Sequence, residues 1–199
     1  MRQQPGKCSS KSIERGLYDE AKFAYNQAMR LFIAVNCDDE VKRQILKLQE
    51  RLRVQAVRGN FSRPENLHVT LAFLGETPQA RLDCLYHIVE SVQAPPFEIT
   101  FNHAGCFKRR SAELWWLGAN PADPGLATLT AIQKQLVHLL EAERFYVDKK
   151  PFSAHITLGR EIARQQPIAL DCPSIPIRVE RISLMKSEHI RGVLTYTEL

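Results

Sequence analysis

The chain has 199 residues, of which 44% are hydrophobic and 25% are charged, a composition that suits one compact domain or two small lobes sharing a core and excludes large-scale disorder. Lysine and arginine number 27 against 22 aspartate and glutamate, so the formal charge is +5, a surplus that is compatible with an anionic ligand or with solubility alone. Five cysteines without a CxxC pair exclude a disulfide framework and a zinc ribbon, and the lack of a secretory leader or of an apolar run of roughly 20 residues predicts a cytoplasmic protein.

The first predicted elements follow a polar N-terminal stretch. Residues 1–28 are weakly patterned and are expected to form a poorly structured extension, whereas residues 29–199 are expected to form the folded domain. The segment "MRLFIAV" from Met29 is typical of a first strand. A helix is expected next, with Asp38 or Asp39 as its N-cap. Its apolar stripe consists of Val41, Ile45, Leu48 and Leu52.

The segment "ENLHVTLAFLGE", residues 65–76, reads as a strand whose apolar run contains a histidine and a threonine. Side chains alternate between the two faces of an extended chain. One face is therefore expected to carry apolar residues, and the other is expected to carry His68, Thr70 and Ala72. The apolar face would consist of Leu67, Val69, Leu71 and Phe73.

The rest of the chain alternates between helical and extended patterns. A second amphipathic helix is predicted around residues 79–92, and the segments "PFEITFNHAGCF" and "AELWWLGA" are typical of strands. A third helix is predicted over residues 126–140, where leucine and isoleucine recur at helical spacing. Three more strands are expected to complete the chain.

One short pattern occurs twice. The segment "AHITLG", residues 154–159, repeats the order of "LHVTLA" about half of the ordered chain later. A single histidine on a strand is usually structural. A histidine that recurs together with its threonine instead indicates two related lobes, each presenting one His-x-Thr face to a shared functional site.

Two imidazoles facing one site can divide acid and base catalysis, because histidine titrates near pH 6.5. Each threonine lies two residues beyond its histidine, so its hydroxyl can donate a hydrogen bond to an oxygen held between the rings. A tetrahedral phosphate matches this arrangement, since phosphoryl transfer gains mainly from positioning and from stabilised charge. No metal or other cofactor is required.

The segments "RPENLHVTLAFLGE" and "KPFSAHITLGR" resemble the paired motifs of the two-histidine phosphoesterase superfamily. The resemblance is greatest to its RNA 2′,3′-cyclic phosphodiesterase branch, also called the 2′-5′ RNA ligase family, and extends from about Met29 to the C-terminus. It implies an α+β fold with two pseudo-symmetric lobes, each an antiparallel sheet backed by helices, around a central cleft. It also implies metal-independent hydrolysis of RNA 2′,3′-cyclic phosphate ends to 2′-phosphates, in a protein expected to be a monomer that acts on RNA ends or nucleotides.

The resemblance also implies individual roles. His68 would be the proton donor to the 3′ oxygen and His155 the proton acceptor that activates water, while Thr70 and Thr157 would hold the phosphate. The sequence itself shows two equivalent histidines and does not distinguish donor from acceptor. Arg160 matches a basic position of the second motif, where it could bind the phosphate or a base; the alternative is a solvated charge at the end of a strand.

Other aromatic and histidine residues are weaker candidates. Phe152 and Trp115 could stack on a base, but an aromatic side chain beside a strand more often belongs to the core. The histidines that lack a threonine partner are expected at surface or structural positions. They are His87, His103, His138 and His189.

Three functional readings stay open from the sequence. The first is hydrolysis of cyclic phosphate ends, and the second is a non-catalytic module that binds nucleotides or RNA ends. The third is 2′-5′ ligation of RNA halves at the same site, although hydrolysis should be favoured in water without coupling to ATP. Zinc chemistry and serine hydrolysis are not supported, because HExxH and GxSxG motifs are both missing from the sequence.

Overall fold

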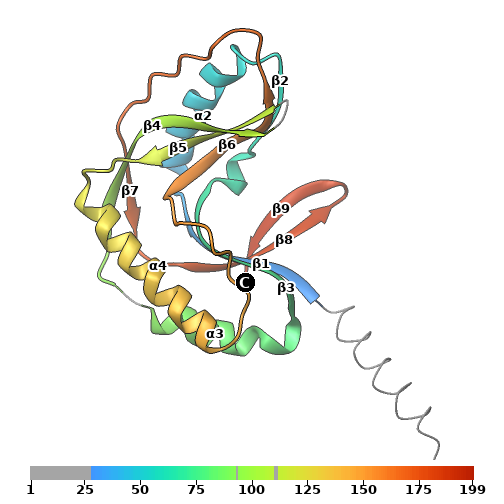
Figure 1. Cartoon of the computed structure of the whole chain (residues 1–199), viewed down its shortest axis with the longest axis vertical. Coiled ribbons are helices and arrows are strands. Elements are labelled where there is room, and N and C mark those ends of the chain that lie inside the picture. The colour runs from blue at the N-terminus through green and yellow to red at the C-terminus, as the bar shows by residue number, and fades with distance from the viewer. Residues whose placement is uncertain (1–27, 93, 110–111) are drawn as a thin grey trace, which may run out of the picture.

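The computed structural model describes residues 28–92, 94–109 and 112–199. The predicted extension, residues 1–28, lies outside these ranges except for Ala28, which opens the first strand. No helix in the described ranges is long and apolar enough to span a membrane. The predicted α+β class, with antiparallel sheets backed by helices, is confirmed (Figure 1).

The described strands form a single antiparallel sheet with two halves. The order is β7-β4-β5-β6-β3-β1-β8-β9, and β2 also pairs with β6. The first half contains β7 (Ile175–Val179), β4 (Phe97–Arg109), β5 (Ala112–Ala119), β6 (His155–Ala163) and β2 (Arg58–Phe61). The second half contains β3 (His68–Pro78), β1 (Ala28–Asn36), β8 (Ser183–Ile190) and β9 (Val193–Glu198).

The helices follow the amphipathic stripes read from the sequence. They are α2 (Asp39–Arg53), α3 (Leu82–Ser91) and α4 (Pro124–Ala142), with short 3₁₀ turns η1 (Pro64–Asn66) and η2 (Gln79–Arg81). Asp38 is the N-cap of α2, because its carboxylate accepts a hydrogen bond from the backbone N–H of Val41 at 2.8 Å. Helix α2 packs on β2, β6 and β7, while α3 and α4 pack together on the other side of the molecule (Figure 1).

The chain crosses between the two half-sheets several times. It leaves β1 in one half, forms α2 and β2 in the other, and returns for β3. It crosses again for β4 to β7 and returns for β8 and β9. The two His-x-Thr repeats therefore lie on neighbouring central strands, β3 and β6, although they are far apart in the sequence.

The strict alternation expected along residues 65–76 is wrong beyond Thr70. In the β1–β3 pairing, Ile33 lies opposite Ala72 and Ala34 lies opposite Thr70, so Leu71 is an extra residue in β3. A bulge of this kind shifts the following side chains to the other face. Ala72 is accordingly buried, and Phe73 is 46% exposed instead of belonging to the core.

The expectation of three strands after the third helix is also wrong, because four are present. The C-terminal segment folds back on itself as the hairpin β8–β9. Arg191 and Gly192 form its two-residue turn with φ values of 51° and 80°. Two successive positive φ values are typical of the type I′ turns that connect hairpin strands, and glycine adopts them without strain.

Gln49 connects α2 to the strand that carries the second motif. This glutamine is buried, and its side-chain N–H groups donate to the carbonyl oxygens of Ser62 at 2.7 Å and Leu158 at 2.8 Å. Leu158 follows Thr157 directly, so the helix is fixed to the backbone beside the motif. A buried amide that satisfies two carbonyls contributes to stability through both bonds and its packing.

We expect Gln49→Ala to lower the free energy of unfolding by about 2 kcal/mol, because both hydrogen bonds and the packing of a buried side chain are lost. Urea denaturation would measure the change. Gln44→Ala is the matched control on the same helix, since the Gln44 amide donates to Glu40 within that helix, and we expect a change of about 0.5 kcal/mol or less. Equal losses in the two variants would contradict this role of Gln49.

Candidate active site

The two motif strands are paired in the sheet at one position. Val69 of β3 lies opposite Ile156 of β6, and both side chains are buried in the core. Neighbouring residues on each strand project from the other face of the sheet. In this antiparallel arrangement the flanking residues lie across from one another. They are His68 with Thr157, and Thr70 with His155.

His68 is held by hydrogen bonds at both ring nitrogens. Its Nδ1 lies 2.8 Å from the carbonyl oxygen of Asn66, and its Nε2 lies 2.9 Å from Oγ1 of Thr70. A carbonyl oxygen can only accept, so Nδ1 carries the proton and the Nε2 of the neutral ring accepts from the threonine hydroxyl. In this tautomer the Thr70 hydroxyl is directed at Nε2 of His68.

Asn66 is a supporting residue that the sequence analysis did not identify. Its side-chain oxygen accepts from the backbone N–H of Tyr196 at 3.1 Å, and its side-chain nitrogen donates to the carbonyl of Leu194 at 2.9 Å. Strand β9 thus fixes the residue whose carbonyl orients His68. The Tyr196 ring also lies edge-on to the His68 ring, with centroids 5.2 Å apart.

His155 has an equivalent anchor in the other half-sheet. Its Nδ1 lies 2.8 Å from the carbonyl oxygen of Ser153, two residues earlier, as Asn66 lies two residues before His68. The same argument assigns the Nδ1–H tautomer and leaves Nε2 able to accept a proton. The rings of Phe107 and Trp116 contact His155 with centroid distances of 5.8 Å and 6.2 Å.

Burial keeps both imidazoles neutral at physiological pH in the free protein. Desolvation lowers the pKa of His68 to about 4; the hydrogen bond to Asn66 opposes this change, and the charges of Arg160 and His155 add to it. Desolvation also lowers the pKa of His155, again opposed by its backbone hydrogen bond and assisted by Arg160. The positive charge of Arg160 thus contributes to the lowered pKa of both rings.

A second bulge explains how Arg160 comes near the histidines. Strict alternation would put this residue on the face opposite Thr157. In the β5–β6 pairing, however, Trp115 lies opposite Gly159 and Trp116 lies opposite Thr157, so Leu158 is an extra residue. Arg160 is exposed on the shifted strand. The bulge follows Thr157 as the bulge at Leu71 follows Thr70, so the structural repeat extends beyond the motif itself.

The two weaker aromatic candidates take structural positions. Trp115 is buried, and its indole N–H donates to the Glu113 carboxylate at 2.9 Å. Phe152 is half-buried against the core. The neighbouring Trp116, which the sequence analysis did not select, lies on the face of the histidines because it pairs with Thr157. Among the described residues, no three His, Cys, Asp or Glu side chains are grouped so that they could hold a metal ion.

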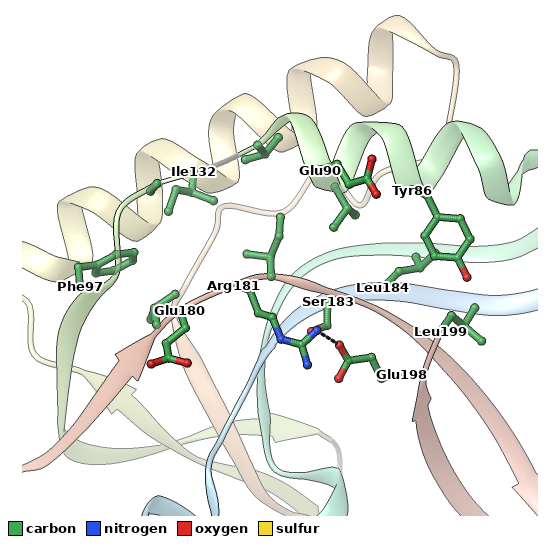
Figure 2. Close-up of a pocket in the computed structure, with 15 residues that line it drawn as sticks. Tyr86, Glu90, Phe97, Ile132, Glu180, Arg181, Ser183, Leu184, Glu198 and Leu199 are labelled. Carbon is green, nitrogen blue, oxygen red and sulfur yellow. Dashed lines mark hydrogen bonds and ion pairs between the residues drawn. The ribbon is translucent and has the colours of Figure 1, made fainter.

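A separate cavity of about 380 Å³ lies between α3, α4 and the C-terminal strands (Figure 2). Arg181 forms an ion pair with Glu198 at its wall, while Ile132 and Phe97 supply apolar surface. None of the predicted site residues lines this cavity. The chemistry-bearing side chains are therefore gathered at the β3–β6 junction and not in this cavity.

Comparisons with known proteins agree with the geometry. The model of the LigT-like phosphoesterase family matches residues 35–116. The RNA 2′,3′-cyclic phosphodiesterase of Thermotoga maritima is 30% identical over 169 residues, which cover 80% of this chain and 87% of the relative. That of Archaeoglobus fulgidus is 33% identical over 148 residues, which cover 72% and 78%.

Solved structures give the same result. The crystal structure of Escherichia coli LigT complexed with 3′-AMP matches with a TM-score of 0.74 and 26% identity, covering 86% of this chain and 95% of that one. The paired motifs, the shared sheet and the relatives all lead to one assignment. The chain belongs to the LigT-like phosphoesterase family, in the group whose members are named RNA 2′,3′-cyclic phosphodiesterase.

Proposed function

We propose that the chain hydrolyses RNA 2′,3′-cyclic phosphate ends to 2′-phosphates by acid and base catalysis from His68 and His155. The observation that carries this proposal is the pairing of Val69 with Ile156, which brings the two His-x-Thr motifs to one face of the sheet. The named activity of the Thermotoga maritima and Archaeoglobus fulgidus relatives supports the reaction. The 3′-AMP complex of Escherichia coli LigT supports a nucleotide or RNA end as the ligand.

His155 is the proposed proton acceptor. Its Nδ1–H is fixed by the Ser153 carbonyl, so the free Nε2 takes a proton from water while the water oxygen forms a bond to phosphorus. The bond from phosphorus to the 3′ oxygen breaks, and its electron pair stays on that oxygen. Protonated His68 gives its Nε2 proton to the 3′ oxygen, which leaves as a hydroxyl while the phosphate remains on the 2′ oxygen.

Thr70, Thr157 and Arg160 would stabilise the phosphate. The hydroxyl of Thr70 is already directed toward Nε2 of His68, so it can turn to donate to a phosphate oxygen placed between the rings. Thr157 occupies the corresponding position on β6. Arg160 adds a permanent positive charge near both imidazoles, and such a charge favours the transition state, in which negative charge accumulates on the equatorial oxygens.

The lowered histidine pKa values restrict this mechanism. A donor with a pKa of about 4 is mostly neutral near pH 7 in the free protein, so His68 must gain its proton when the anionic substrate binds. An anion beside an imidazolium raises the pKa of that ring. Substrate binding would therefore favour protonation of His68, and the site would contain an imidazolium mainly when substrate is bound.

The defining experiment uses an oligonucleotide that ends in a 2′,3′-cyclic phosphate. We expect the protein to convert it to an end bearing a 2′-phosphate, because the 3′ oxygen is the group protonated as it leaves. Chromatography against synthetic 2′- and 3′-phosphate standards would identify the product. A 3′-phosphate product would contradict the substrate orientation, and binding without turnover would favour the non-catalytic nucleotide-binding module.

Replacement of either histidine should remove most of the turnover. We expect His68→Ala and His155→Ala each to lower kcat by roughly 10² to 10⁴, the usual contribution of a general acid or base. His87→Ala is the matched control, because the His87 side chain is 83% exposed on α3. Steady-state kinetics would be compared with thermal unfolding of each variant. Near-normal turnover in a folded His68→Ala or His155→Ala protein would remove that residue from the mechanism.

The pH dependence should be bell-shaped, because activity requires one protonated and one neutral histidine. The kcat/KM profile reports the free protein, in which burial lowers both pKa values from 6.5 and that of His68 to about 4. We therefore expect the kcat/KM maximum below pH 6.5, and the kcat maximum at a higher pH because bound phosphate stabilises the imidazolium.

The single variants separate the two limbs of this profile. The residual rate of His155→Ala should lose the acidic limb, and that of His68→Ala should lose the alkaline limb. A flat profile through the histidine range, or the opposite loss of limbs, would show that the donor and acceptor roles are wrongly assigned.

A further inference from the structure

Glu161 has a left-handed backbone conformation in the middle of β6. Its φ is 54°, a value that residues with a β-carbon seldom adopt, because the β-carbon then approaches the following carbonyl oxygen. Among the described residues other than glycine, Arg144 and Arg191 also have a positive φ. They follow helix α4 and form the β8–β9 turn, where such values are common. Glu161 lies inside a strand, so its strain has no such local cause.

The strained residue belongs to an irregular stretch of β6 that surrounds Arg160. On one side of Arg160, Leu158 is the extra residue of the bulge described above. On the other side, residues 161 and 162 of β6 oppose the single residue Gly59 of β2. The register against β5 shifts there as well. Bulges redirect individual side chains out of the regular alternation of a sheet, and the residue that lies between these two bulges is Arg160.

Gln49 holds the backbone on the first side of Arg160. The carbonyl oxygen of Leu158 accepts from the Gln49 side chain at 2.8 Å and from the backbone N–H of Ser62 at 2.9 Å. The same side-chain nitrogen of Gln49 donates to the Ser62 carbonyl at 2.7 Å. Gln49 is only 4% exposed, so these hydrogen bonds lie in a medium of low dielectric constant, which strengthens them. Two donors on one carbonyl therefore fix the chain two residues before Arg160.

Strand β2 holds the backbone on the second side. Asn60, which lies opposite Arg160, donates its side-chain N–H to the Glu161 carboxylate at 2.7 Å. A β-carbon on Gly59 would lie 2.2 Å from Cδ1 of Ile162, so β2 can approach the bulge this closely only with glycine at this position. The left-handed residue is thus supported through its side chain and by a closely packed neighbouring strand.

The first motif has a bulge without this strain. The carbonyl oxygen of Leu71 accepts from the Gln133 side chain of α4 at 3.4 Å, as that of Leu158 accepts from Gln49. The positive φ in β3 belongs to Gly75, at 67°, and glycine adopts such a value freely. Of the two motif strands, both described in full, only the one that carries the guanidinium group contains a strained residue.

We propose that the bulged segment of β6, residues 158–162, positions the Arg160 guanidinium against the phosphate, with Gln49 and Glu161 as the positioning residues. This inference rests on the proposed function, because Arg160 would bind the phosphate of that substrate. Backbone strain persists where the surrounding contacts over-determine it, and it gathers at functional sites. A backbone fixed on both sides of Arg160 leaves only the side chain to be ordered when the guanidinium binds an anion.

The first test separates stability from activity. Glycine adopts a φ of 54° freely, so Glu161→Gly should leave the melting temperature unchanged or raise it, while the backbone beside Arg160 gains freedom. We expect kcat/KM on the cyclic phosphate end to fall about tenfold, the scale of one weakened hydrogen bond to a charged group. Glu161→Gln keeps the β-carbon and an acceptor for Asn60, so it should restore kcat/KM. Normal activity of Glu161→Gly, or equal losses in the two variants, would contradict the proposal.

The second test asks whether both residues act through Arg160. Gln49→Met keeps the size of the buried side chain but removes its donors, and we expect kcat/KM to fall about tenfold. In an Arg160→Ala background, Gln49→Met and Glu161→Gly should lower kcat/KM no further. Gln133→Met makes the same change beside the first motif, so any effect should be equal with and without Arg160. Losses of Gln49→Met and Glu161→Gly that simply add to that of Arg160→Ala would overturn the proposal. Thermal unfolding would confirm that each variant is folded.

A titration without substrate gives an independent measurement. Burial is the main cause of the lowered pKa of His155, and the charge of Arg160 adds to it, so a guanidinium that moves away raises that pKa. NMR titration of this ring should show a higher pKa in Glu161→Gly, Gln49→Met and Arg160→Ala. Gln133→Met should leave the pKa unchanged.

The titration also separates the two proposals. An unchanged pKa of His155 in Glu161→Gly and Gln49→Met would overturn the positioning of Arg160. A protein that shows the expected pKa changes but hydrolyses no cyclic phosphate end would contradict the proposed reaction and support the positioning.

Discussion

The site depends on one contact between the two half-sheets, the pairing of Val69 with Ile156. Both side chains are buried, so the hydrophobic effect holds the two motif strands together from the core side. The alternation of an extended chain then requires the residues on either side of this pair to project from the opposite face. Four polar side chains from distant parts of the sequence are positioned by the packing of two apolar ones.

The bulges at Leu71 and Leu158 determine what surrounds these four side chains. Without them, Phe73 and Arg160 would point toward the core side of the sheet, where an unpaired guanidinium would be very costly to bury. With them, both residues reach the exposed face. The repeated leucine after each threonine is therefore part of the same structural unit as the histidine and threonine.

The sequence was sufficient to predict the elements that depend on local periodicity, and the His-x-Thr repeat was sufficient to predict which strands should meet. It could not predict the bulges, because an extra residue is defined by the register of the neighbouring strand and not by the chain that contains it. Trp115 is buried, as the sequence analysis favoured, while the position of Trp116 on the face of the histidines follows from its pairing with Thr157. Asn66 was missed because it orients His68 through its backbone carbonyl and is itself held by β9, a strand near the C-terminus. Neither contact leaves a pattern in the sequence around Asn66.

Hydrolysis needs a donor and an acceptor, so a site built from two copies of one motif must become asymmetric through its surroundings. The residue three positions after each threonine provides one difference, since Phe73 follows Thr70 and Arg160 follows Thr157. The second half-sheet places Tyr196 beside His68, while the first places Phe107 and Trp116 beside His155. The two motifs are alike, so these different neighbours, and not the motifs themselves, are what can make one histidine a proton donor and the other a proton acceptor.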